Sequence, residues 1–261
     1  MAGRPDEAEP WLQRAERTGK AEAEPAAGLA ARYIRGMLEL ARGQDADALA
    51  AFQAAESLAK RLDAPHRLAS STQAWILLTL IRLGQIQRAE QALADLGELD
   101  HDGGRTRIGA ATLRLAQDDP HAATAALAPV LDGSVPVPIQ PWLIEAFVPE
   151  AIARDALGDL AASGRALERA LDLAEPDGAL LRFLLHPAPG LLERHARNRT
   201  AHPALIAEIL SLLAGSMPAP SPAGSRPSPS LAPWACSRLP HATDKQVPVP
   251  ALASHGAGHP A

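Results

Sequence analysis

The chain has 261 residues, a formal net charge of −5 and only 3 % aromatic residues. Alanine occupies 56 positions and favours helix, whereas the strand formers Tyr, Phe and Trp are too scarce for a β-sandwich or β-barrel. The mild acidity argues against strong nucleic-acid binding, and the single cysteine, Cys236, excludes an intrachain disulfide framework and a thiolate cluster for zinc.

The N-terminal stretch shows neither a secretory nor a membrane signal. Its first ten residues, MAGRPDEAEP, lack an apolar core, and no apolar run in the chain reaches the ~20 residues that span a bilayer. We therefore expect a cytoplasmic protein. Residues 1–27 are polar and predict a flexible segment, with a short helix around Trp11 to Arg17 and a weak linker at Glu24-Pro25.

A recurring turn predicts helical hairpins in the middle of the chain. The turn contains Gly43, Gly84 and Gly158, and Asp118 takes the place of the glycine in a degenerate copy. These four positions are 41, 34 and 40 residues apart, which is typical of helix–turn–helix repeats of ~34 to ~47 residues. A glycine just past a helix ends it in the left-handed conformation at low cost. Alanines at helical spacing after each turn then allow close helix packing.

The fold class that we predict is all-α, a tetratricopeptide-like helical-hairpin solenoid over residues 28–214. It has about four hairpins and a capping helical segment, and we expect it to be right-handed. A loop at 132–138 separates two hairpins, because Pro136 and Pro138 cannot continue a helix. The expected helices are 29–42, 46–62, 66–83, 86–97, 105–116, 120–131, 140–157, 160–174, 179–184, 189–197 and 202–214.

The composition changes sharply near Gly215. Residues 215–261 contain ten prolines and only four charged residues. Such a segment cannot bury enough apolar surface to offset the entropy of ordering, so we predict a disordered tail.

Several sequence runs between Glu39 and Leu213 resemble one family. They are Leu127–Gly133 (LAPVLDG), Trp142–Phe147 (WLIEAF), Ala151–Asp159 (AIARDALGD), Ala170–Gly178 (ALDLAEPDG) and His186–His195 (HPAPGLLERH). The segment is similar to the helical-repeat region of bacterial LuxR-type transcription regulators of the MalT-like class. In that family the repeats lie between a nucleotide-binding domain and a helix-turn-helix domain that binds DNA. The resemblance implies a sensor region that binds a protein or a small-molecule inducer.

The chain departs from that family at both ends. The only Gly-Lys pair is Gly19-Lys20, and a phosphate-binding loop would need Gly at Arg14 and Ser or Thr at Ala21. After Leu213 the proline-rich tail replaces the expected helix-turn-helix segment. We therefore expect a chain truncated before its DNA-binding domain, with no direct DNA binding of its own. A stand-alone tetratricopeptide-like adaptor and a non-functional remnant of a frame-shifted gene remain the alternatives.

The sequence favours neither catalysis nor a cofactor. His186, His195 and His202 are clustered near Glu193, but Pro203 indicates a helix start near His202, so capping or surface roles are favoured over a metal site. No Gly-x-Ser-x-Gly motif is present. We therefore predict a non-enzymatic protein without a cofactor.

The scarce aromatic residues provide the candidate binding site. Tyr33, Trp75, Trp142 and Phe147 fall on the first helices of hairpins, which line the inner surface of a solenoid. Aromatic and Arg side chains are common carriers of binding energy, although the interpretation that we favour for each aromatic residue is that it fills a gap between alanine-rich helices. The predicted ligand- or partner-binding residues are Tyr33, Trp75, Arg82, Arg107, Arg114, Trp142 and Glu145.

Overall fold

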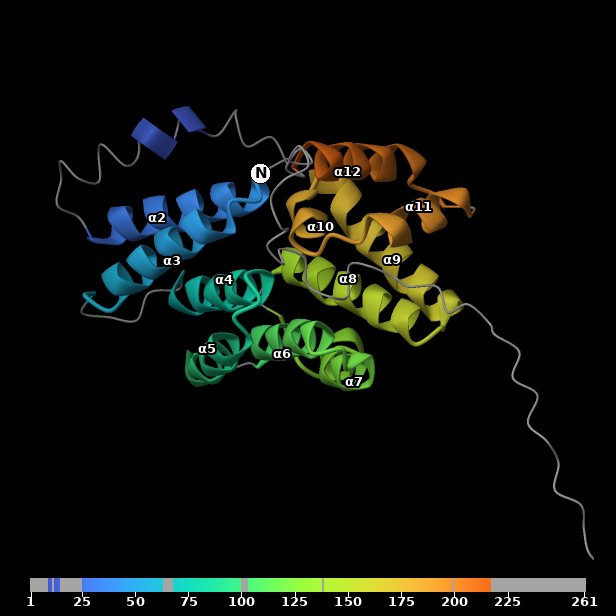
Figure 1. Ribbon diagram of the computed structural model, residues 1–261, viewed down its shortest axis with the longest axis horizontal. Helices are drawn as coiled ribbons and strands as arrows, with labels where there is room; N and C mark the ends of the chain where they lie inside the picture. Colours follow the sequence, from blue (N-terminus) through green and yellow to red (C-terminus); the bar gives the residue numbers. More distant parts are fainter. Residues whose placement is uncertain are drawn as a thin grey trace, which may run out of the picture.

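The protein folds into a curved series of helical hairpins (Figure 1). The computed structural model describes residues 9–10, 12–14, 25–62, 68–99, 103–137, 139–198 and 200–216. The regular structure of these residues is helical, which confirms the predicted class. The helices are α2 (Pro25–Ala41), α3 (Asp45–Ala59), α4 (Leu68–Arg82), α5 (Ile86–Leu99), α6 (Gly104–Ala116), α7 (Pro120–Leu131), α8 (Gln140–Ala156), α9 (Leu160–Ala174), the 3-10 turn η1 (Glu175–Asp177), α10 (Leu181–Leu185), α11 (Pro189–Arg197) and α12 (Pro203–Ser216).

Two predictions concern residues that are only partly described. Pro25, which we assigned to a linker, is the first residue of α2, a position that suits proline because the missing N–H would be unbonded there anyway. Residues 9–10 and 12–14 are helical, and the rest of the predicted Trp11–Arg17 helix lies outside the described residues. The predicted disordered tail lies outside them from residue 217 onwards.

The four predicted turns share one backbone geometry. Gly43, Gly84, Asp118 and Gly158 have φ of 73°, 69°, 61° and 78°, and Asp118 is the only non-glycine residue with positive φ among those described. In each turn the next residue donates its N–H to the carbonyl five residues earlier, as from Gln44 to Glu39 at 2.8 Å. This pattern is the Schellman motif, which satisfies carbonyls that the helix end leaves unbonded.

Small buried residues hold the two helices of each hairpin together. Five residues after each turn position stands a side chain that is at most 1 % exposed: Ala48, Ala89, Ala123 and Ser163. The Ser163 hydroxyl is satisfied because it donates to the Ala151 carbonyl at 2.7 Å. The first hairpin also has Gly36 on its first helix, where an added Cβ would lie 2.5 Å from the Phe52 ring. The two helices of each hairpin therefore approach closely because the residues between them are small.

The first helices of successive hairpins, α2, α4, α6 and α8, contact one another and form what we call the inner face. The short helix α10 lies inside the arc of hairpins and contacts both α2 and α8 (Figure 1). The buried residues form two main clusters. Leu181 and Leu185 of α10 belong to the cluster of the first two hairpins, and Phe183 and Leu184 to the cluster of the later helices. Helix α10 therefore joins the two halves of the core.

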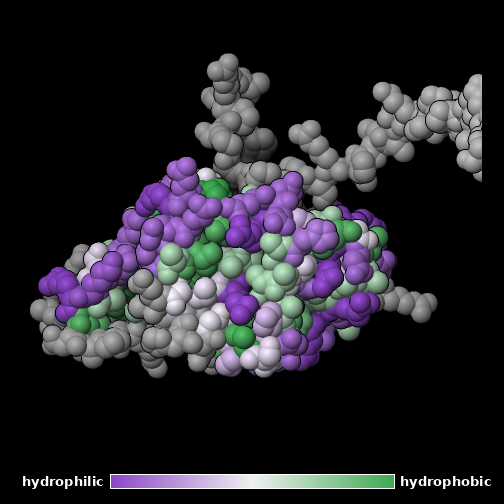
Figure 2. Space-filling view, turned by 90° about the horizontal axis from the view of Figure 1, so that it is seen from below, coloured by the Kyte–Doolittle hydropathy of each residue, from purple (hydrophilic) through white to green (hydrophobic). Residues whose placement is uncertain are grey.

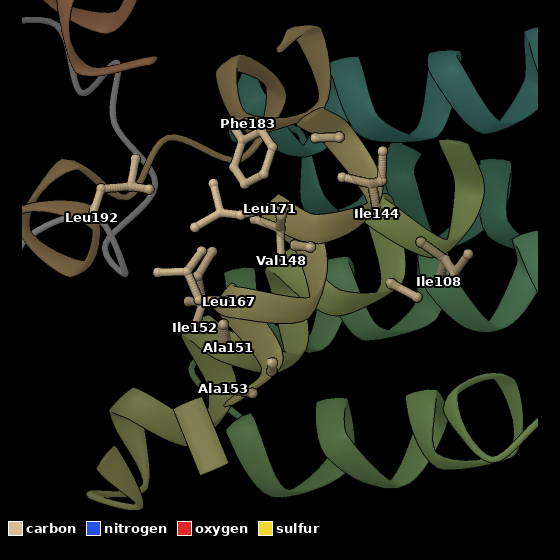
Figure 3. Close-up of a cluster of buried hydrophobic side chains, with 14 of the residues drawn as sticks. Ile108, Ile144, Val148, Ala151, Ile152, Ala153, Leu167, Leu171, Phe183 and Leu192 are labelled. Atoms are coloured by element: carbon tan, nitrogen blue, oxygen red, sulfur yellow. The ribbon is translucent and has the colours of Figure 1, made fainter. Parts of the chain in front are cut away.

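Figure 3 shows the larger cluster, with Phe183 directed towards Leu171 of α9 and Val148 of α8. The outer surface differs in character. The side seen in Figure 2 is largely hydrophilic, with hydrophobic residues in scattered patches among the hydrophilic ones. Burial is thus concentrated between the helices.

Candidate functional site

Five of the seven predicted binding residues are brought together at α10. The Arg182 side chain contacts Trp75 of α4 and both Trp142 and Glu145 of α8. Tyr33 of α2 is hydrogen-bonded to Trp75. Arg82, at the end of α4, contacts the carboxyl end of α10. The remaining two, on α6, lie elsewhere: Arg107 and Arg114 are exposed, and Arg114 donates to the Gln117 side chain at 2.9 Å.

Aromatic rings from α2, α3, α4 and α8 form a continuous row. The ring centroids of Tyr33 and Phe52 are 6.2 Å apart, those of Phe52 and Trp75 6.1 Å, and those of Trp75 and Trp142 6.1 Å. The Trp75 indole N–H donates to the Tyr33 hydroxyl oxygen at 2.8 Å. Both tryptophans are buried, with 1 % and 4 % of their surface exposed. The row is thus covered by other side chains.

Arg182 of α10 covers these rings. Its guanidinium carbon lies 4.9 Å from the Trp75 ring centroid and 5.3 Å from that of Trp142, both within the range of a cation–π interaction. Its Nη1 donates to the Glu145 carboxylate at 2.6 Å. Burial raises the pKa of Glu145, and the positive charge of Arg182 opposes this shift without cancelling it. Arg182 and Glu145 therefore form a buried ion pair, and removing either side chain would leave the other charge buried without compensation.

Arg82 fixes the end of α10. Its Nη1 donates to the carbonyls of Leu184 and Leu185 at 3.3 and 3.2 Å, and its Nε donates to Asp45 at 2.8 Å. The last carbonyls of a helix lack intrahelical partners, and a cation at this end also interacts favourably with the helix dipole. Arg82 therefore anchors α10, which is a role that the sequence did not reveal.

A small cleft with about 20 Å³ of space for water-sized molecules, partly open to solvent, lies beside this group. It is lined by Ala74, Leu77, Leu78, Ile81, Arg105, Ile108, Gly109, Thr112, Trp142, Glu145 and His186. These residues come from α4, α6 and α8, together with His186 just after α10. The cleft is therefore mainly apolar, with polar groups contributed by different elements, and it has room for only one or two water molecules.

His186 is the polar group of the cleft with an unmet hydrogen bond. The residue is 3 % exposed, and its Nε2 is buried without a hydrogen-bond partner. Burial, reinforced by the positive charges of Arg82 and Arg182, lowers the pKa of His186 to about 3. The imidazole is therefore neutral over the ordinary pH range.

The sequence did not indicate Arg182 or the position of His186. One signal was present for Arg182, because it is the only charged residue in the run from Ala179 to Leu185. A lone Arg in such an apolar run needs a buried partner if the run packs into a core. The identity of that partner, Glu145, depends on the tertiary fold.

The other two clustered histidines bind α9 through carboxylates. His195 Nε2 lies 2.6 Å from Glu168, and His202 Nε2 lies 2.9 Å from Asp172, with its Nδ1 3.2 Å from Glu175. Burial acts to lower the pKa of His202, but the hydrogen bonds to the carboxylates outweigh it and raise the pKa. These contacts attach α11 and the start of α12 to α9 and η1.

Neither a metal centre nor a membrane span is found in the described part of the chain. No group of three or more His, Cys, Asp or Glu side chains there is arranged to hold a metal ion. No helix among the described residues is both long and apolar enough to cross a bilayer. In comparisons with known proteins, no family model, curated protein or solved structure matches this chain.

Proposed function

We propose that the chain is a non-enzymatic binding module that detects a small-molecule or protein ligand at its inner face. The observation that carries the proposal is the convergence of an aromatic row, a buried ion pair and a partly open cleft where α4, α6 and α8 meet α10. Ligand sites commonly combine an apolar lining with a few polar groups from separate elements. The LuxR-type resemblance supports the same role, since the repeats of that family form the sensor region.

The arrangement supports binding better than catalysis. The carboxylate of Glu145 is engaged by Arg182, and Nε2 of the neutral His186 has no hydrogen-bond partner among the described residues that would orient it as a base. We therefore keep the non-enzymatic proposal, with the stand-alone adaptor as an alternative that shares the same inner face.

A thermal-shift screen of the full chain tests the proposal. Sugars, amino acids, nucleotides, short organic acids and peptides are each added, and the melting temperature is recorded. A true ligand raises it, because binding to the native state alone stabilises the protein. The same compounds are then tested on Trp142→Phe, which keeps an aromatic ring, and on the control Arg107→Gln, whose side chain is exposed.

The variants determine whether binding occurs at the inner face. We expect Trp142→Phe to reduce the ligand-induced shift and Arg107→Gln to leave it unchanged. If every active compound shifts both variants as much as the unmodified chain, the site lies elsewhere. If a compound is instead turned over to a product, the non-enzymatic proposal is wrong.

A further inference from the structure

A short N-terminal segment lies against one face of α2. Residues 9–10 and 12–14, which we call the arm, are helical, and Leu12 is 3 % exposed because it packs with Ala31 and Leu38 of α2. These three residues form a cluster separate from the two main ones. Residues three or four apart share a face of a helix. The face that the arm contacts, which we call the α2 stripe, consists of Ala31, Ile34, Arg35, Leu38 and Arg42.

Glu9 of the arm joins two arginines of the α2 stripe. Nη1 of Arg35 donates to both carboxylate oxygens of Glu9, at 2.8 and 2.9 Å, and Nη1 of Arg42 donates to one of them at 2.9 Å. The hydrogen bond from Arg35 lowers the pKa of Glu9 to about 2 against the opposing effect of burial, so this carboxylate is ionised at ordinary pH. Glu39 of α2 also lies 3.4 Å from Arg35 and 3.5 Å from Arg42. Without Glu9, two arginines would face one glutamate, and the stripe would attract a negative group.

The arm covers the α2 stripe only in part. Leu12 is buried, whereas Pro10, Gln13 and Arg14 are exposed. Ile34 of the stripe stays 37 % exposed and is one of three exposed large hydrophobic residues in the described part of the chain. Ten residues, 15–24, connect the arm to α2, and a connection of this kind gives a segment an effective concentration on the order of millimolar. A longer helix that also covers Ile34 gains contacts with which it can displace the arm.

We propose that the α2 stripe is the docking surface for an acidic amphipathic helix of a partner protein, and that the arm is an internal substitute for that helix. The arm shows the chemistry that the surface selects. A glutamate binds Arg35 and Arg42, and a leucine three residues later packs against Ala31 and Leu38. The partner helix adds an apolar residue over Ile34. The charges then set specificity and register, and the apolar anchors at helical spacing supply affinity.

Fluorescence anisotropy on the full chain with a labelled peptide of residues 6–17, DEAEPWLQRAER, tests the proposal. The unmodified chain should bind the peptide weakly, because its own arm competes. The variant Glu9→Arg/Leu12→Asp, which we call the open chain, has an arm that no longer fits, so it should bind at least ~10-fold more tightly. Added salt should weaken this binding, since it screens the charges. Should the open chain fail to fold, Glu9→Gln replaces it and removes only the charge.

Charge reversal identifies the surface to which the peptide binds. In the open chain, Arg35→Glu should weaken binding at least ~10-fold, because it replaces an attraction by a repulsion. A peptide that carries the Glu9→Arg substitution should then bind this variant more tightly than the original peptide does. The control is Arg61→Glu, which makes the same charge change at an exposed position after α3 and should leave binding unchanged.

Three outcomes would overturn the proposal. Equal binding of the peptide to the unmodified and open chains, or no binding to either, would make the arm a fixed part of the fold. Binding that survives Arg35→Glu in the open chain would mean that the peptide binds elsewhere. Analytical ultracentrifugation covers the third outcome: an unmodified chain that is dimeric, and an open chain that is monomeric, would mean that two copies exchange their arms. The occupant of the stripe would then be a second copy and not a partner helix.

Discussion

The guanidinium carbon of Arg182 lies 4.9 Å from the centroid of the Trp75 ring, which joins a five-residue helix to the second hairpin of the solenoid. Cation–π contacts are worth up to ~2 kcal/mol or more when they are shielded from water. Here the guanidinium also neutralises the buried carboxylate of Glu145. Arg182 therefore contributes more to the position of α10 than an exposed arginine could.

Replacing Arg182 should expose this dependence. In Arg182→Met the carboxylate of Glu145 is left buried without its partner, so we expect the free energy of unfolding to fall by ~3–5 kcal/mol. The double variant Arg182→Met/Glu145→Gln should recover much of the loss, because no charge remains to be buried. Urea denaturation measures both. Arg197→Met is the control, since Arg197 is exposed, and an equal loss there would contradict the explanation.

Acid should destabilise the protein through His186. The pKa of this group is lowered to about 3 in the folded state, whereas in the unfolded chain it is ~6.5. The unfolded state therefore binds the proton first. The stability contributed by the neutral ring is complete above ~6.5 and falls by up to ~1.4 kcal/mol per pH unit between ~6.5 and ~3.

Chemical denaturation at several pH values measures this slope. His186→Phe cannot titrate and should show a weaker dependence on pH in that window. His121→Gln keeps the buried imidazole of His186 and should retain the slope of the unmodified chain. An unchanged slope in His186→Phe would mean that other groups cause the acid sensitivity.

Helices α11 and α12 should detach more easily as the pH rises. Burial acts to lower the pKa of His202, but the carboxylates of Asp172 and Glu175 outweigh it and raise the pKa above its usual value. A histidine with a raised pKa contributes stability below the unfolded value of ~6.5, and this contribution is lost as the pH rises through the folded value. Hydrogen exchange at Ile206 and Ile209, corrected for the intrinsic rate, should therefore show lower protection at about pH 8 than at about pH 6.

His202→Gln is the comparison for that experiment. The variant should show low protection of α12 at both pH values, since glutamine carries no charge to pair with Asp172 and Glu175. Protection of α4 should stay constant in both proteins. A pH response that persists in His202→Gln would contradict this role of the imidazolium.

Substitutions at two of the turn positions should change the stability of the protein differently. Gly84 has a φ of 69° and open space around an added Cβ, so Gly84→Ala should cost ~1–2 kcal/mol through backbone strain alone. Asp118 already has that conformation with a side chain, at a φ of 61°. Asp118→Gly should therefore destabilise little or even stabilise, by up to ~1 kcal/mol. Thermal denaturation distinguishes the two, and losses of equal size would contradict the strain argument.

The hairpins could be predicted from the sequence because their signals are local. A glycine past the last helical residue, as at Gly43 or Gly158, allows a left-handed conformation at low cost whatever the neighbouring helices do. The predicted start of α7 at Pro120 is observed because Asp119 caps the helix by accepting from the Ala122 N–H at 2.9 Å. These choices involve residues within one turn of each other.

The site could be predicted only in part, because it depends on contacts across the chain. Trp75 and Trp142 were placed correctly on first helices, but no local pattern indicates that α10 lies over them. The position of α10 depends on the ion pair between Arg182 and Glu145 and on the hydrogen bonds from Arg82 to the end of α10. Such pairings become visible only when the hairpins are assembled. The binding role of these residues stays a prediction.

The position of α10 also sets an order of events during synthesis. The hairpins leave the ribosome first, and the segment that covers their aromatic face follows only when Leu185 has been made. At ~5–20 residues per second, Trp75 waits for roughly 5–20 s before α10 arrives. During that interval the nascent chain presents an apolar inner face without its cover. Chaperones therefore have their best access to this face before the chain is complete.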